Sequence, residues 1–249
     1  DFGDGATASG DEVTHTWVDD GTYTITVTAS DEDGGETTET FNISISNRAP
    51  TLQVSASATS GDEGDSFAFS AVTSDVTDDT VSVTWDFGDG QTATGLAVTH
   101  TFTDDGTFVV EVIASDEDGG VTSEKLFITI ANVAPTLTNL QLPSSVKQGE
   151  PVTVSIEATD PGDDEVTITW NWGDGTTDEG GTVTHTYDKV GTYTVTVCAT
   201  DDDGGEVCQQ ATIPIELLQQ AEDDGGLLPG FGLLSALAML GLLAIFRRR

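Results

Sequence analysis

Two short loops rich in aspartate are the places in this sequence whose residues and spacing could do chemistry. The three aspartates of each loop have the same relative positions: Asp75, Asp78 and Asp79 in one, Asp160, Asp163 and Asp164 in the other. Calcium takes roughly six to eight oxygen ligands, which carboxylates and carbonyls on adjoining loops can supply. Two explanations compete with a calcium site. Aspartate is favoured in turns, and a protein of a salt-loving organism carries acid on its exposed loops.

The charge of the chain excludes one broad class of function. Asp and Glu number 44 against 7 Lys and Arg, which gives a formal net charge of -37. A field of that sign repels phosphate backbones, so we expect no nucleic-acid partner. The apolar fraction of 36%, which leaves out 28 glycines, is ordinary for folded domains. The acid therefore belongs to the surfaces of folded domains, and such surfaces suit a medium rich in salt or cations.

The aspartate loops belong to a repeat with an offset of 85 residues. The sequence DFGDG at 1–5 returns at 86–90 and, as NWGDG, at 171–175. The same offset relates the acidic turns at 31–35, 116–120 and 201–205. It divides the chain into a partial repeat at 1–46 and complete repeats at 47–131 and 132–216. Because residue 1 aligns with Asp86, we expect this chain to be the C-terminal piece of a longer protein.

Apolar and polar residues alternate with a period of two, which predicts half-buried strands. The alternation occurs at the same place in all three repeats: Tyr23, Ile25 and Val27; Phe108, Val110 and Val112; Tyr193, Val195 and Val197. Trp85 and Trp170 lie in another alternating strand and are predicted core anchors. No helical period occurs before residue 227. Short strands separated by Gly/Asp turns predict an all-β fold of tandem antiparallel β-sandwiches.

The order of motifs within a repeat resembles that of a known family. W-D-F-G-D-G is followed by V-T-H-T-F and then by D-G-T-F-x-V-x-V within residues 85–112. This order resembles the PKD domain, an immunoglobulin-like sandwich, and the resemblance covers residues 1–216. It implies an extracellular module of microbial surface-layer proteins or secreted hydrolases, with a spacer or interaction role and no chemistry of its own.

The resemblance also implies a set of calcium ligands. Some PKD-like domains of secreted proteases bind calcium with a linker asparagine and with acidic residues of nearby loops. By position, the candidates are Asn47, Asp75, Asp78, Asp79 and Asp116 in one repeat, and Asn132, Asp160, Asp163, Asp164 and Asp201 in the next. The earlier loop has Val76-Thr77 where the later one has Pro161-Gly162, so we expect the later site to be the better match.

The composition changes after the last strand. Residues 217–228 form an acidic, glycine-containing spacer, and an apolar run continues to Phe246. At about 1.5 Å per residue, this run is long enough to cross a membrane as a helix. Three arginines follow at 247–249, which predicts a cytoplasmic C-terminus and repeats on the outer side.

A tripeptide at the head of the C-terminal segment 229–249 favours processing of that helix. Pro229-Gly230-Phe231, with the apolar run and the basic end, resembles the PGF-CTERM sorting signal of archaeal surface proteins. In that family an archaeosortase removes the helix, and a lipid takes its place. A retained single-span anchor and a buried core helix are the alternatives.

Cys198 and Cys208 lie symmetrically about Asp203 of an acidic turn. The strand period places both out of phase with inward residues, so both face outward on two strands that the turn joins. This is the arrangement of a cross-strand disulfide, which suits an oxidising exterior. A metal-binding pair and two free thiols are the alternatives.

Two further motifs have ordinary explanations. His15, His100 and His185 occupy one repeat position, where the period points His100 inward, so we expect structural histidines and neither a zinc site nor a catalytic triad. Asn42-Ile43-Ser44 is a glycosylation sequon whose asparagine faces outward. A chance occurrence competes with modification of Asn42.

These patterns predict a structural and adhesive protein, a stalk of repeats on the outer face of an archaeal membrane, with Ca²⁺ as a stiffening ligand. The expected partners are the membrane, an archaeosortase-type processing enzyme, and other surface proteins or glycans. The rival hypothesis is the C-terminal spacer and anchor of an exported protease or glycosidase whose catalytic domain lies upstream of residue 1. Nearly all aromatic residues take inward phase, which disfavours direct binding of a polymeric substrate.

Overall fold

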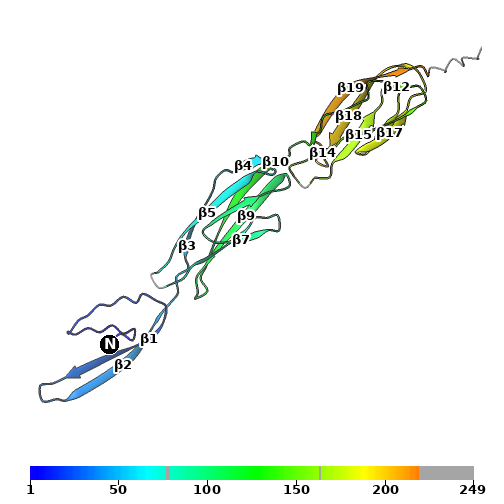
Figure 1. Ribbon diagram of the computed structural model, residues 1–249. Coiled ribbons are helices and arrows are strands. Elements are labelled where there is room, and N and C mark those ends of the chain that lie inside the picture. The colour runs from blue at the N-terminus through cyan, green and yellow to red at the C-terminus, as the bar shows by residue number, and fades with distance from the viewer. Residues whose placement is uncertain (77–78, 163, 219–249) are drawn as a thin grey trace, which may run out of the picture.

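The computed structural model describes residues 1–76, 79–162 and 164–218. Every regular element within these ranges is a strand, so the predicted all-β fold is confirmed there. Three repeats follow one another in a row, and strands pair within their own repeat (Figure 1). The predicted membrane helix and the motif at Pro229 lie outside the described residues. Within the described ranges, no helix has the length and apolarity that a membrane span requires.

The first repeat contains a single antiparallel hairpin. β1 (Gly21–Ser30) pairs with β2 (Glu36–Ile45) across the acidic turn at 31–35. Among the described residues of this repeat, no second sheet faces the hairpin. Val27 and Phe41 are in inward phase, yet each is 54% exposed. In the second repeat, two strands of the opposing sheet, at 51–56 and 66–74, precede Asp86, and this sequence begins at the position equivalent to Asp86.

The second repeat is a sandwich of two sheets, ordered β3-β5-β8 and β4-β10-β9-β6-β7. Its strands are β3 (Thr51–Ala56), β4 (Ser60–Asp62), β5 (Ser66–Ser74), β6 (Ser82–Asp86), β7 (Thr92–Thr94), β8 (Ala97–Thr101), β9 (Gly106–Ser115) and β10 (Val121–Ala131). Alternation along β5 buries Phe67, Phe69 and Ala71 and exposes the serine and alanine residues between them. Period-two patterning thus forms the inner face of this sheet.

Trp85 anchors the core of the second repeat, as predicted. Its side chain is 1% exposed, and its ring centroid lies 5.8 Å from that of Phe69. The indole Nε1 donates a hydrogen bond to the backbone oxygen of Gly95 at 2.8 Å. The large ring therefore contributes apolar burial while its one polar atom stays paired.

The third repeat has the same architecture with one sheet divided. A five-stranded sheet β12-β19-β18-β15-β16 faces two short pairs, β13-β17 and β11-β14. Its strands are β11 (Thr136–Leu137), β12 (Val146–Lys147), β13 (Pro151–Ser155), β14 (Ala158–Thr159), β15 (Thr167–Asn171), β16 (Thr177–Glu179), β17 (Thr182–Thr186), β18 (Gly191–Thr200) and β19 (Glu206–Glu216). Trp170, Trp172 and Tyr187 are at most 1% exposed and form the centre of its core.

One strand pair in each complete repeat departs from the predicted antiparallel pattern. β4 runs parallel to β10, and β12 runs parallel to β19. The reason is the path of the chain, which leaves the first sheet after its opening strand and joins the opposite sheet beside the last strand. First and last strands then run in the same direction. The chain therefore enters a repeat at one end and leaves at the other, which sets the repeats in a row (Figure 1).

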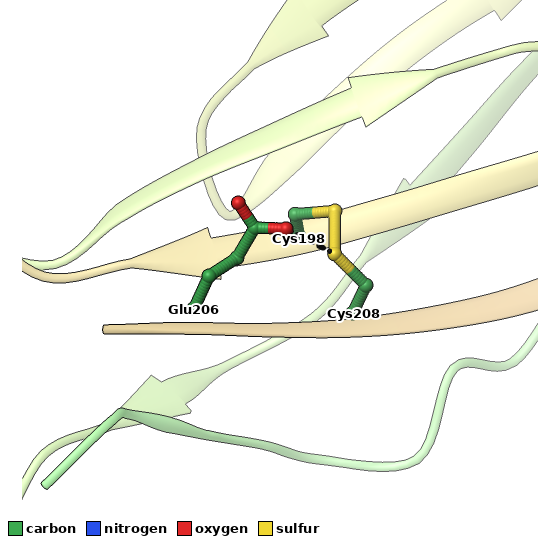
Figure 2. The surroundings of a disulfide bond; sticks show 3 residues. All are labelled: Cys198, Glu206 and Cys208. Atoms are coloured by element: carbon green, nitrogen blue, oxygen red, sulfur yellow. Dashed lines mark hydrogen bonds between the residues drawn. A yellow bond between two sulfur atoms is a disulfide. The ribbon is translucent and has the colours of Figure 1, made fainter. Parts of the chain in front are cut away.

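A disulfide joins Cys198 of β18 to Cys208 of β19 (Figure 2). The two residues are direct partners in the ladder, with Cα atoms 4.1 Å apart. Val197 and Ala199 on either side of Cys198 are buried, so the bond lies on the outer face of the sheet. The predicted cross-strand disulfide is confirmed, and the alternatives of free thiols or a metal-binding pair are wrong.

Candidate metal sites at the domain junctions

The acidic turn between the last two strands of a repeat is organised by its first aspartate. In the second repeat, Asp116 Oδ1 accepts hydrogen bonds from the backbone N–H of Asp118 at 3.0 Å and of Gly120 at 2.7 Å. Its Oδ2 accepts one from Asn47 Nδ2 at 3.0 Å. A Cβ at Gly120 would lie 2.8 Å from the Cα of Ala49, so glycine is what lets the linker pack against the turn.

The third repeat has the same hydrogen bond between the linker asparagine and the first aspartate of the turn, a contact that we call the clamp. Asp201 is 5% exposed, and its Oδ1 accepts the N–H of Gly205 at 2.6 Å. Its Oδ2 accepts a hydrogen bond from Asn132 Nδ2 at 3.2 Å. A Cβ at Gly205 would lie 2.9 Å from the Cα of Ala134. The linker asparagine is therefore tied to the acidic turn in both complete repeats.

This clamp fixes the orientation of both asparagine amides. An ionised carboxylate can only accept hydrogen bonds, so the amide nitrogen must face it and the amide oxygen must point away. The oxygens left over, Asn47 Oδ1 and Asn132 Oδ1, are buried and have no hydrogen-bond partner. We call the contact region around Asn47, between the first and second repeats, the first junction, and the region around Asn132, between the second and third repeats, the second junction. Each junction therefore holds one amide oxygen that could accept a hydrogen bond but has no donor.

At the first junction, the loop before β6 brings two more carboxylates to the turn. Asp75, Asp79 and Asp116 each offer an oxygen, and these oxygens lie within 4.8 Å of one another. Arg48 and Asp75 line a small cavity of about 100 Å³ beside the linker. The linker at this junction therefore carries one positively charged residue.

At the second junction, carboxylates from two repeats converge. Glu63, which follows β4 of the second repeat, offers an oxygen within 4.8 Å of oxygens of Asp160 and Asp164 in the third. Glu63 is 3% exposed, and its Oε1 accepts a hydrogen bond from the N–H of Val133 at 2.7 Å. This site therefore spans the boundary between two domains.

Buried side-chain atoms without a hydrogen-bond partner mark both junctions. Among the described residues there are six such atoms, and all six are oxygens at these two places: Asn47 Oδ1, Asp75 Oδ2, Glu63 Oε2, Asn132 Oδ1, Asp160 Oδ2 and Asp164 Oδ2. Buried polar groups are normally paired, and an unpaired one costs roughly 1–3 kcal/mol. Acceptors that converge without a donor have the electrostatics of a cation site.

Mutual repulsion within these groups appears in the pKa values of the carboxyls. Burial, followed by the charges of Glu63 and Asp160, raises the pKa of Asp164 to about 6. Burial also raises the pKa of Glu63, against the hydrogen bond from Val133 that lowers it. At the first junction, burial and then the charge of Asp75 raise the pKa of Asp79. Like charges about 4 Å apart near a protein surface repel by about 4 kcal/mol, so a divalent cation would relieve this repulsion.

The ends of the repeats that face one another are acidic as well. Asp19 and Asp20 of the first repeat form a group with Asp118 of the second, with oxygens within 4.8 Å of one another. Across the second junction, burial and then the charges of Asp105, Asp202 and Asp104 raise the pKa of Asp203. The lysine–carboxylate pairs of the described residues lie elsewhere, at Lys125–Glu111 and Lys147–Glu216.

The donor set at both junctions fits calcium. Every candidate ligand is an oxygen and carboxylates dominate, as a hard cation with flexible coordination prefers, and each junction also holds a buried amide oxygen without a partner. Zinc prefers nitrogen and sulfur ligands, and these groups contain neither. Bound calcium would supply charge neutralisation and a rigid link between loops.

Comparison with known proteins places this architecture in a family. The PKD domain model matches residues 1–45, 47–130 and 132–216. The chain belongs to the PKD domain family. A microbial collagenase of Vibrio alginolyticus is 38% identical over 76 residues, which are 30% of this chain and 9% of that protein. The match is therefore shorter than one 85-residue repeat, and the chain covers only a small part of that relative's length.

Solved structures of PKD domains are also similar to single repeats of this chain. The PKD1 domain of the Vibrio cholerae metalloprotease PrtV is 30% identical, with 33% of this chain and 98% of that chain covered and a TM-score of 0.29. The PKD domain of a peptidase from a Thermoplasmatales archaeon is 25% identical, with coverages of 34% and 98% and a TM-score of 0.31.

The PKD fold brings together most of the residues predicted as ligands. The structure joins Asn47 to Asp116 and groups that aspartate with Asp75 and Asp79; in the next repeat it joins Asn132 to Asp201 and places Asp160 beside Asp164. Asp78 and Asp163 lie outside the described residues. Whether a metal binds stays a prediction.

Sequence analysis missed Glu63. A signal was available, because at the offset of 85 residues Glu63 corresponds to Gln148. The backbone contacts agree, since Glu63 N donates to Ala131 O and Gln148 N donates to the equivalent Glu216 O. An acid replaced by an amide at one repeat position was a reason to examine that position.

The three repeated histidines have a structural environment. His100 is 8% exposed, stacks on Phe87 with ring centroids 3.9 Å apart, and has its Nε2 2.6 Å from Asp89 Oδ2. The pairs His15–Asp4 and His185–Asp174 repeat this contact at 2.6 and 2.8 Å. In the complete repeats the pair ties the GDG turn to β8 or β17, in agreement with the structural role predicted.

Proposed function

We propose that this chain is a stalk of PKD repeats at a cell surface, in which calcium at the junctions holds consecutive domains in a fixed orientation. The observation that carries the proposal is the placement of all six partnerless buried oxygens of the described residues at the two junctions. The first group lies within residues 47–131 but includes the linker residue Asn47, and the second group includes Glu63 of the preceding repeat. Ligands placed at linkers affect how one domain is held against the next.

The path of the chain supports a mechanical role. Entry and exit lie at opposite ends of each complete repeat, so added repeats extend the chain in one direction (Figure 1). The linkers are short and packed, with Pro50 O accepting a hydrogen bond from Thr122 Oγ1 at 2.5 Å. A packed linker between acidic ends gives an extended molecule whose stiffness depends on cations.

The anchoring part of the proposal rests on sequence. The apolar run ending at Phe246, the basic tail at 247–249 and the motif at Pro229 support a C-terminal membrane anchor or its replacement by a lipid on the outer face of an archaeal cell. Asn42 is exposed on β2, where it would be open to glycosylation. We assign no catalytic role to any residue of the chain.

A second candidate function is the spacer of an exported hydrolase, with the catalytic domain in another part of the protein. The names of the similar proteins favour it, since they include a collagenase and a metalloprotease. One exposed apolar pair also favours contact with a polymer. Phe127 on β10 is 62% exposed opposite Val109, which is 38% exposed, so the expectation of inward aromatics has an exception here.

Calcium titration of the full chain tests the proposed role of the junctions. In calcium-free buffer with concentrated potassium chloride, we expect calorimetry to detect two binding events and small-angle scattering to show a narrower range of molecular dimensions after calcium is added. Magnesium should act more weakly, because it requires a stricter octahedral shell. No binding heat and no change in scattering up to about 10 mM calcium, above the range of extracellular modules, would overturn the proposal.

The two candidate functions differ in what accompanies the repeats. Intact mass and peptide sequencing of the protein recovered from its native membrane would distinguish them. Additional PKD repeats and a lipid near Pro229 are the expected result for a surface stalk. A catalytic domain in the same polypeptide would contradict the surface stalk and support the second candidate, the spacer of an exported hydrolase.

A further inference from the structure

We infer that the second junction is a shared cation site, in which Glu63 of one PKD repeat supplies a ligand to the acidic loop of the next. This inference rests on the proposed calcium function and adds to it a ligand from the preceding domain. Its consequence is that binding at this site depends on the relative orientation of the domains 47–131 and 132–216, and that binding in turn fixes that orientation.

The first argument is the state of the Glu63 carboxylate. Glu63 is only 3% exposed, and its Oε1 accepts a hydrogen bond from the N–H of Val133 at 2.7 Å. The other oxygen, Oε2, has no partner. Asp160 and Asp164 each also have a buried, partnerless Oδ2. The three carboxylates offer oxygens within 4.8 Å of one another, and each has one unpaired buried oxygen.

The second argument is the close fit around this carboxylate. A Cβ built on Gly162 would lie 2.9 Å from Glu63 Oε2 and 3.0 Å from the backbone oxygen of Thr103. A Cβ built on Gly64 would lie 3.3 Å from the Cβ of Pro161. The loop of the third repeat therefore approaches the second repeat through glycines, at the place where the carboxylates meet.

The third argument comes from the equivalent position of the third repeat. Gln148 there donates its Nε2 to the backbone oxygen of Asp188 at 2.7 Å and makes an ordinary neutral contact. An amide thus fits this turn. The second repeat has a charged group instead, placed against two other acids, which destabilises the junction unless a cation is present.

Substitution of Glu63 tests the shared site in the full chain. Glu63→Gln keeps the shape and the acceptor for Val133 and removes the charge. We expect calorimetry at pH 7.5 to show one of the two calcium sites weakened about tenfold, with the other unchanged, because ligand charge sets affinity at such sites. Asp62→Asn is the matched control, since Asp62 is an exposed neighbour whose loss of charge should leave both affinities as they were.

A distance measurement tests the coupling to orientation. The native cysteines are joined in a disulfide, so spin labels at Thr92→Cys and Thr177→Cys, on exposed equivalent positions of β7 and β16, would report the arrangement of the two domains. We expect calcium to narrow the distance distribution in the parent and in the Asp62→Asn protein. The distribution should stay broad with Glu63→Gln at a calcium concentration that saturates the other site.

The outcomes separate this inference from the function on which it rests. If the parent binds no calcium, the proposed function fails and the shared site fails with it. If the parent binds two ions and Glu63→Gln binds them with the same affinities and the same narrowing, only the shared site is overturned. An unchanged thermal transition of the calcium-free Glu63→Gln protein, or a higher one, shows that the variant folds.

Discussion

The two junctions of this chain use the same clamp but differ in the charges around it. Both tie a linker asparagine to the first aspartate of an acidic turn. At the first junction the next linker residue is Arg48, which lines a cavity with Asp75. At the second junction that residue is Val133, whose N–H holds the extra carboxylate Glu63. The position equivalent to Glu63 at the first junction would lie before residue 1, so the two junctions can be compared only at the linker and loop residues. At the second junction, by our proposal, Glu63 makes the contact between the domains depend on a cation.

The difference extends to the loops. The second junction has Pro161-Gly162 where the first has Val76-Thr77, and Gly162 is the residue that admits Glu63. The linker residue Val133 and the loop residue Gly162 therefore both lie against the carboxylate of Glu63.

Removal of two ligands at one junction should have the largest effect. For Asp160→Asn with Asp164→Asn we expect calcium affinity at the second junction to fall by about a hundredfold or more, because each charged ligand contributes roughly 1.5–3 kcal/mol. The matched pair, Asp75→Asn with Asp79→Asn, should lower calcium affinity at the first junction and leave the affinity at the second junction unchanged. Calorimetry that shows loss of both sites with either pair would contradict the assignment of one site to each junction.

Loss of the disulfide should distinguish the third domain from the second. The second repeat has Ile113 and Ser123 where the third has Cys198 and Cys208. Cys198→Ile with Cys208→Ser should lower the unfolding free energy of the third domain by about 2–3 kcal/mol, the range for a short closed loop. Scanning calorimetry should show one transition moved down and the transition of the second domain unmoved. Equal shifts in both would mean that the domains unfold as one unit.

Gly162→Ala should weaken the second junction without changing any charge. The added Cβ would meet Glu63 Oε2 and the Thr103 backbone oxygen at about 3 Å, so the two domains must separate slightly. We expect about tenfold weaker calcium binding there, roughly 1.4 kcal/mol. The effect should shrink when Glu63→Ala is also present, as a double-mutant cycle measures. Full additivity would indicate that Gly162 and Glu63 act independently.

Exchange of the linker residues should have the smallest effect. Arg48→Val should strengthen calcium binding at the first junction about threefold, and Val133→Arg should weaken it at the second by a similar factor, because exposed charge pairs contribute about 0.2–1 kcal/mol. The difference between parent and variant should decrease at high potassium chloride. Shifts of the same sign in both variants would refute the role given to linker charge.

Much of the fold could be predicted from local patterns. The period of two identified the strands and placed Trp85 and Trp170 in the cores, because side-chain direction alternates along any strand. The disulfide was predictable for a related reason. Cys198 and Cys208 lie on strands joined by one tight turn, so their register follows from counting residues on either side of Asp203.

The remaining features depend on contacts between distant segments. Glu63 meets Val133 across 70 residues of sequence, and nothing near Glu63 indicates which loop it will face. The parallel pairing of β4 with β10 likewise follows from where the chain crosses between sheets.

The sequence by itself determined the repeat, the strand faces, the disulfide and the residue types able to bind a cation, since each is a property of neighbouring residues and a fixed backbone period. Only the tertiary structure decided which oxygens are buried without partners and which domains they come from. Burial and hydrogen bonding are set by all the groups that surround an atom. At the second junction, those groups belong to two different repeats.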